Sequence, residues 1–283
     1  TLFQTQTVDH YTILAAIING FILLPYILLF TPSGFIADKY SKAKVIQYTA
    51  FAAIPLTLAI WFCYSQGYFW GAYFATLLLA IQSAINSPAK YGYIKELSSG
   101  SQIAKLNSYV QTLAIISILT GTVVFTVLFT YFLAPIAGTP DSHDSSIILQ
   151  TFAPLGSLLV LFASFEWWLS LKLPVNEASD LESTYEMKNY FKGYYLKRFL
   201  QIANQKNIIM ASILCLAIFW GINQVLLACF GAFVKDHLPD SGILFVQGSM
   251  ALGGIGIFFG AMYAGKVSRG YIETGVIPVA TLG

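Results

Sequence analysis

Residues 34–44 read GFIADKYSKAK. Three lysines and one aspartate occupy the last seven of these positions, although charged residues make up only 10% of the chain. A long apolar stretch lies on each side, at about 11–37 and 45–64. We therefore interpret residues 34–44 as a polar turn between two apolar helices, and the environment of those helices decides the fold.

The composition points to a membrane protein. Of 283 residues, 57% are hydrophobic and 16% are aromatic, and the mean hydropathy is +0.68. A soluble domain of this size cannot bury so much apolar surface. Apolar runs of about 18 or more residues can cross a bilayer, and in lipid they must be helical because no backbone polar group can stay unpaired. The sequence predicts an all-α membrane protein.

We expect seven complete membrane spans and the start of an eighth near Glu273. The complete spans are predicted at 11–37, 45–64, 68–86, 106–134, 147–171, 207–234 and 243–264.

The distribution of basic residues predicts the orientation of the spans. All Lys and Arg residues except Lys235 fall in or beside alternate connections, which the positive-inside rule makes cytoplasmic. Residues 1–10 are then outside, so a span is expected to precede them, and the last span is cut at Gly283. We interpret the chain as a fragment. The cytoplasmic basic residues are Lys39, Lys42, Lys44, Lys90, Lys95, Lys105, Lys172, Lys188, Lys192, Lys197, Arg198, Lys206, Lys266 and Arg269.

The longest polar connection, 174–206, divides the spans into two groups. We predict an N-terminal helix bundle at 1–173 without its first span, a cytoplasmic linker at 174–206, and the start of a truncated C-terminal bundle at 207–283. Two six-helix bundles in the full chain would follow, with the fragment covering about spans 2–9. An eight-helix channel or receptor with one long loop is the alternative.

Within the linker, residues 185–200 mix aromatic side chains with cations. This mixture is typical of a helix that lies on the membrane surface and is attracted to anionic head groups. A solvated connector between two spans would have a similar composition.

The turn at residues 34–44 resembles the loop signature of the major facilitator superfamily, between its second and third spans. The matching residues are Gly34, Asp38, Lys39, Lys42 and Lys44. Ser41 departs from the family's usual glycine, which loosens the turn but keeps its charges. The resemblance implies that these residues form a conformational latch on the cytoplasmic side. The alternative is that the lysines only fix the topology.

Two further stretches are similar to bacterial lysophospholipid transporters, including members fused to an acyltransferase. Residues 86–97, NSPAKYGYIKEL, follow a span, with Ser87 in place of glycine. Residues 272–283, IETGVIPVATLG, resemble the start of the ninth span, with Thr274 in place of leucine. The similarities touch both halves of the fragment.

The resemblance implies a multi-pass transporter of the bacterial inner (plasma) membrane, which is not itself an enzyme. It would move lysophospholipids or other amphiphiles inward by alternating access, for reacylation. Its implied partners are the lipid bilayer, the amphiphile and a fused or associated acyltransferase. Two alternatives stay open: a secondary transporter of a small polar solute, and the membrane module of a fused acyltransferase enzyme.

Several residues could contact a substrate. If Asn86 or Ser87 caps a helix with Pro88 at its first position, Lys90 and Tyr91 lie near the cytoplasmic surface and could bind a phosphate diester. A snorkelling lysine beside an interfacial tyrosine is equally compatible with the sequence. Glu166 is an acid inside a span, or else lies near the interface. The neutral candidates are Asn19, Gln82, Gln111, Asn223 and Gln224.

Other function classes lack support. The three cysteines lie in apolar spans without ligand spacing, and the three histidines lie in outward connections, so neither a disulfide framework nor a metal site is indicated. The sequence has no phosphate loop, nucleophile elbow, dinucleotide motif or basic patch for nucleic acid. We expect no cofactor.

Overall fold

Helices account for every regular element in the described part of the computed structural model. That part comprises residues 18, 20–98, 102–136, 138–139, 144–175, 185–238 and 243–267. The predicted eighth span lies outside it. The helices form two compact units: Thr1–Glu96 with Phe132–Glu186, and Leu97–Tyr131 with Met187–Gly283. This grouping places most of the helix at 103–133 with the second part of the predicted linker and the segments that follow it. The predicted domain boundaries refer to the order of membrane spans and stay a prediction.

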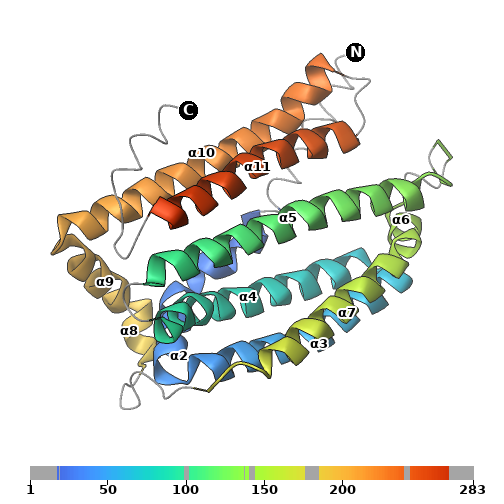
Figure 1. The fold of residues 1–283 in the computed structure, drawn as a ribbon. Helices are drawn as coiled ribbons and strands as arrows, with labels where there is room; N and C mark the ends of the chain where they lie inside the picture. Colours follow the sequence, from blue (N-terminus) through green and yellow to red (C-terminus); the bar gives the residue numbers. More distant parts are fainter. Residues whose placement is uncertain are drawn as a thin grey trace. The chain divides into compact units, whose positions relative to one another are not determined.

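The first unit contains α2 (Phe30–Lys39), α3 (Lys42–Ser65), α4 (Phe69–Leu97), α6 (Ser145–Thr151) and α7 (Ala153–Ser170). The second unit contains most of α5 (Ile103–Leu133), followed by α8 (Met187–Phe191), α9 (Tyr194–Asn204), α10 (Asn207–His237) and α11 (Ile243–Val267). Figure 1 shows α3 beside α7 in the first unit and α10 beside α11 in the second.

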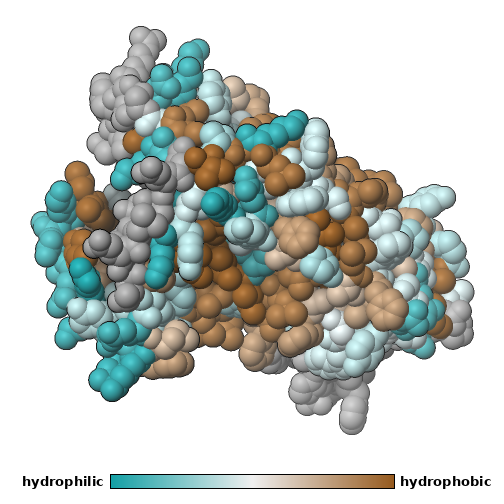
Figure 2. Space-filling view, turned by 90° about the horizontal axis from the view of Figure 1, so that it is seen from below, coloured by the Kyte–Doolittle hydropathy of each residue, from teal (hydrophilic) through white to brown (hydrophobic). Residues whose placement is uncertain are grey.

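Four of the described helices are long and apolar enough to cross a membrane, namely α3, α4, α5 from Lys105, and α7. Two bent pairs would raise the number to six if each were one span. The all-α membrane fold is thus confirmed. The predicted numbering of seven complete spans stays a prediction. Apolar side chains cover much of the surface, as lipid contact requires, and Figure 2 shows broad brown areas on the face in view.

The predicted first span is bent. Helical residues 20–28 and α2 meet at 50°, at Leu29. Pro32 lies four residues after Leu28 and has no N–H to donate to its carbonyl, and a missing bond of this kind is a usual cause of a sharp kink. The predicted span 147–171 is also interrupted, by a turn at Phe152 between α6 and α7.

Helices α3 and α7 pack as an antiparallel pair along their length. The Gln47 side chain donates a hydrogen bond to the Ser170 carbonyl at 3.2 Å. One turn further on, the rings of Phe51 and Trp167 lie 5.4 Å apart. Near the other end, a Cβ on Gly156 would stand 2.9 Å from the Cα of Trp61, so only glycine allows the two backbones to approach this closely.

Candidate functional site

The charged turn joins α2 to α3 in two residues. Helix α2 ends at Lys39, Tyr40 and Ser41 are extended, and α3 begins at Lys42. Ser41 has a φ of −54°, which any L-residue adopts, so serine fits here without backbone strain. The Ser41 hydroxyl is buried and has no hydrogen-bond partner within the described residues. Serine in place of the motif's usual glycine therefore introduces no backbone strain at this position of the turn.

Lys42 is buried at the start of α3, and its ammonium pairs with the Glu96 carboxylate near the end of α4 at 2.5 Å. The two side chains are 8% and 21% exposed. A pair this far from water depends strongly on having both partners, because either charge alone would be costly to bury. The pair therefore ties together the ends of two helices that the predicted topology places at the cytoplasmic face.

Small residues on α4 make room for this lysine. A Cβ on Gly92 would stand 2.7 Å from Cε and 3.0 Å from Cδ of Lys42, so the lysine stem passes directly over the glycine. Gly92 and Glu96 are four residues apart and share one helix face. Ala89, one turn earlier, is fully buried in a cluster with Ala37 and Val45. Side chains of one or no carbon thus let α2, α3 and α4 meet closely at this end.

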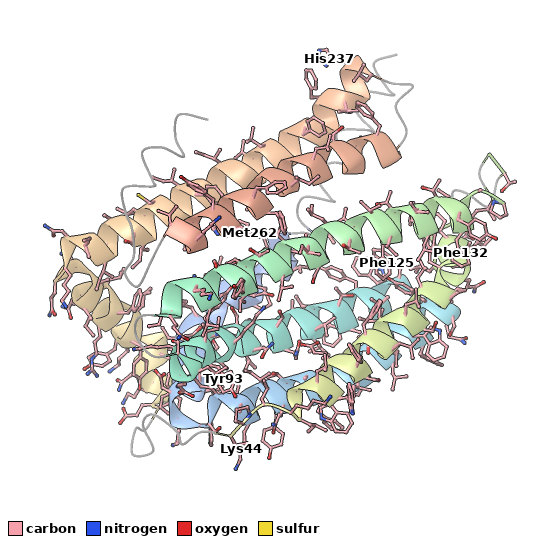
Figure 3. The ribbon with its side chains drawn as sticks, viewed as in Figure 1. Lys44, Tyr93, Phe125, Phe132, His237 and Met262 are labelled. Atoms are coloured by element: carbon pink, nitrogen blue, oxygen red, sulfur yellow. The ribbon has the colours of Figure 1, made fainter. Side chains whose placement is uncertain are left out.

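The other predicted latch residues behave differently. Asp38 is exposed and makes no hydrogen bond or ion pair within the described residues. The Lys39 ammonium lies 5.5 Å from the centre of the Phe35 ring. Lys44 is exposed and points away from the helices in Figure 3. A Cβ on Gly34 would meet no described atom within 4 Å, so no described part of another helix approaches this glycine closely.

The stretch at 86–97 does not begin a helix, and the predicted cap at Asn86 or Ser87 is wrong. Pro88 lies inside α4, which continues to Leu97. The side chain of Asn86 instead accepts a hydrogen bond from the Thr49 hydroxyl at 3.1 Å. Gln82, one turn earlier, donates to the Thr49 carbonyl at 2.8 Å. These polar residues join α4 to α3, which is a structural role.

Lys90 and Tyr91 both lie on α4 and are exposed. Glu166, on α7, is exposed as well. No hydrogen bond or ion pair links Lys90, Tyr91 and Glu166 within the described residues, so their shared role in binding a substrate stays a prediction. Lys172, just beyond α7, lies 3.8 Å from the centre of the Trp168 ring, in the way that interfacial cations and aromatic residues associate.

The remaining candidates are scattered or undescribed. Gln111 is half-buried on α5, in the second unit. Asn19 lies outside the described residues, as do the side chains of Asn223 and Gln224.

The described linker residues on either side of 176–184 contact the first unit. The Tyr93 hydroxyl, on α4, donates to the Pro174 carbonyl at 2.8 Å (Figure 3). At the other end, the Tyr185 ring lies 5.0 Å from the Phe35 ring. Its hydroxyl is 3.5 Å from that of Thr31. The linker is thus attached to the charged end of α2 and α4.

Sequence reasoning missed Glu96 and Gly92 as site residues. A signal was present, because Glu96 and Asp38 are the only acids in the first two predicted cytoplasmic connections. An acid so placed among lysines is a natural partner for one of them. The described residues contain no group of three or more side chains suited to holding a metal ion.

Comparison with known proteins identifies relatives that are named lysophospholipid transporters. The chain is 36% identical over 102 residues to lysophospholipid transporter LplT of Photorhabdus laumondii, covering 36% of this chain and 24% of the relative. It is 30% identical over 130 residues to LplT of Shigella flexneri, covering 46% and 31%. It is 35% identical over 98 residues to LplT of Pectobacterium carotovorum, covering 35% and 23%. No family model and no solved structure matches the chain.

The matched stretch spans less than a third of the length of these relatives. The relatives are named as transporters and not as enzymes. The resemblance to the bacterial lysophospholipid transporter group, made from two short stretches, is confirmed at the level of sequence similarity.

Proposed function

We propose that this chain is part of an alternating-access transporter that moves lysophospholipids across the bacterial inner membrane. The observation that carries the proposal is the similarity to relatives named lysophospholipid transporter, in a chain whose helices suit a membrane. Many of its exposed side chains are large aliphatic or aromatic ones, which suits helices and an amphiphilic substrate in contact with lipid.

The buried Lys42–Glu96 pair supports a refined form of the latch. In this form, Lys42 makes α3 and α4 one rigid element at the cytoplasmic end, and the exposed Asp38 is presented at its edge. Asp38 and Lys39 would then engage the opposite bundle in one transport state and release it in the other. Lys42 has a fixed structural role in this scheme, and Asp38 is the part that switches.

Lys90, Tyr91 and Glu166 are the proposed head-group contacts. Lys90 and Glu166 are both exposed and carry opposite charges, which could bind the phosphate and the ammonium of a zwitterionic head group. The acyl chain would stay against the apolar helices or in lipid. Substrate release inside would supply an acyltransferase, whether fused or separate.

The test is uptake of fluorescent lysophosphatidylethanolamine by proteoliposomes that hold the full chain. Asp38→Asn is expected to slow uptake without changing membrane insertion. Asp144→Asn is the matched control, because asparagine caps the start of α6 as well as aspartate does. Equal rates for Asp38→Asn and the unaltered protein at equal protein levels would refute the latch.

The same vesicles distinguish the alternatives. Uptake of a small polar solute driven by a proton gradient, with no movement of lysolipid, would favour a solute transporter. A full chain in which acylation depends on these helices while lysolipid movement is absent would favour an acyltransferase module.

A further inference from the structure

We infer that helix α9 is an interfacial helix that lies in the plane of the cytoplasmic leaflet and binds its anionic lipid head groups. The inference rests on two features: α9 is an amphipathic, cationic helix, and it is set across the end of α10, which matches a predicted membrane span. It does not depend on the substrate or on transport.

The residues of α9 separate completely into two faces. At about 100° per residue, the apolar side chains fill an arc of about 160°, and the polar side chains and Tyr194 fill the opposite side. The apolar face consists of Tyr195, Leu196, Phe199, Leu200, Ile202 and Ala203. The other face consists of Tyr194, Lys197, Arg198, Gln201 and Asn204.

The apolar face is largely uncovered. Only Ala203 is buried, whereas Leu196, Leu200 and Ile202 are between 49% and 53% exposed. A soluble connector would not leave three large apolar side chains of one short helix half in water, because each would forfeit part of the gain from burial. The face therefore needs a cover, and its width suits insertion into the boundary between head groups and acyl chains.

The direction of α9 sets the helix across the end of α10. Helix α9 and the first part of α10, Asn207–Ile222, meet at a bend of 113°, which is closer to a right angle than to a continuous helix. Helix α10 matches a predicted span, and spans stand within about 20° of the membrane normal on average. A helix set across the end of such a span runs nearly parallel to the membrane surface.

The charge of this segment selects the lipid. Residues 187–206 contain five basic side chains and no acidic one. Each Lys or Arg near an anionic surface favours binding by about fivefold. Gly193 has a φ of 67°, a left-handed conformation that favours glycine, and it separates α8 from α9. The chain therefore turns at Gly193, and α9 starts in a direction of its own.

The test is electron paramagnetic resonance on the full chain in nanodiscs, with its native cysteines replaced. Spin labels at Leu196→Cys and Gln201→Cys lie about 140° apart around the helix. In discs of equal parts phosphatidylcholine and phosphatidylglycerol, the label at 196 is expected to be reached by oxygen and shielded from a neutral nickel chelate. The label at 201 is expected to show the reverse pattern.

Two outcomes would overturn the interfacial position. Equal nickel accessibility at both sites would mean a solvated connector. Shielding of the label at 196 from both oxygen and nickel would mean that protein, including a second copy of the chain, covers the apolar face.

The role of charge is tested with Lys197→Gln combined with Arg198→Gln. Two charges at about fivefold each weaken the helix–membrane equilibrium by about 25-fold, so nickel accessibility at position 196 rises. Lys105→Gln with Lys266→Gln is the matched control, since it removes the same charge from α5 and α11. If the two double variants behave alike, or if discs of pure phosphatidylcholine hold the helix as firmly, the preference for anionic lipid is refuted.

Discussion

Removing the Glu96 carboxylate is expected to destabilise the first unit by about 3 kcal/mol. Glu96→Gln keeps the size of the side chain but removes the carboxylate that pairs with the Lys42 ammonium, and the Lys42 side chain is only 8% exposed. The carboxylate is 21% exposed, so we place the cost at the lower end of the range for breaking buried pairs. An ion pair on the surface would contribute less than about 1 kcal/mol, so the magnitude distinguishes the two situations.

The assay is a double-mutant cycle on the unfolding free energy of the full chain, measured by titration with dodecyl sulfate in mixed micelles. The cycle combines Lys42→Met with Glu96→Gln, and we expect a coupling energy of about 2 kcal/mol. Lys44→Met with Glu96→Gln is the control, because Lys44 is exposed two residues away on the same helix. Its coupling to Glu96 should be within about 0.5 kcal/mol of zero.

Equal coupling for Lys42 and Lys44 would refute the reasoning, because it would show that Glu96 senses only the average positive charge of the turn. A coupling energy near zero for both lysines would show that the pair is solvated in the native membrane protein. Either result would also remove the rigid α3–α4 element on which the refined latch depends.

Two further predictions concern close contacts at glycine and use the same unfolding measurement. Gly92→Ala should lower the free energy of unfolding by about 1–3 kcal/mol, because its methyl group would displace the Lys42 stem. Gly34→Ala is the control and should be neutral or stabilising, since its Cβ meets open space. The same sign for both variants would contradict the packing described. Gly156→Ala should lower the free energy of unfolding by about 2 kcal/mol or more, because its methyl group would meet the Cα of Trp61, a backbone atom that cannot turn aside. A stability equal to that of the unaltered protein would show that α3 and α7 separate freely.

The membrane helices could be predicted well where hydropathy and helix coincide. The span predicted at 45–64 is α3, Lys42–Ser65, and that predicted at 106–134 is α5, Ile103–Leu133. Hydropathy marks the residues that lipid requires to be apolar, and a helix must run through all of them. It says nothing about bends, which is why the kink before α2 and the turn at Phe152 were missed.

The site was harder to predict, because its members are defined by contact and not by type. The motif at residues 34–44 drew equal attention to all its charges, yet the structure buries Lys42 and leaves Asp38 and Lys44 exposed. Nothing in the spacing of the lysines distinguishes them. Lys42 differs from the other lysines because Gly92, on α4, leaves room for its side chain. A single sequence does not show that Gly92 lies next to the turn.

The error in the length of α4 and the failure to identify Glu96 have the same physical cause. Hydropathy ends this span at Asn86, and Pro88 suggests the first position of a new helix. The structure shows instead that α4 continues to Leu97. A helix can outlast its apolar part, because its backbone bonds are internal and its end may project into the head-group region. The ten residues that follow Asn86, up to Glu96, extend about 15 Å as a helix. Only that rigid continuation sets Gly92 and Glu96 on one face, where they receive Lys42; a loop in its place would leave the lysine without a defined partner.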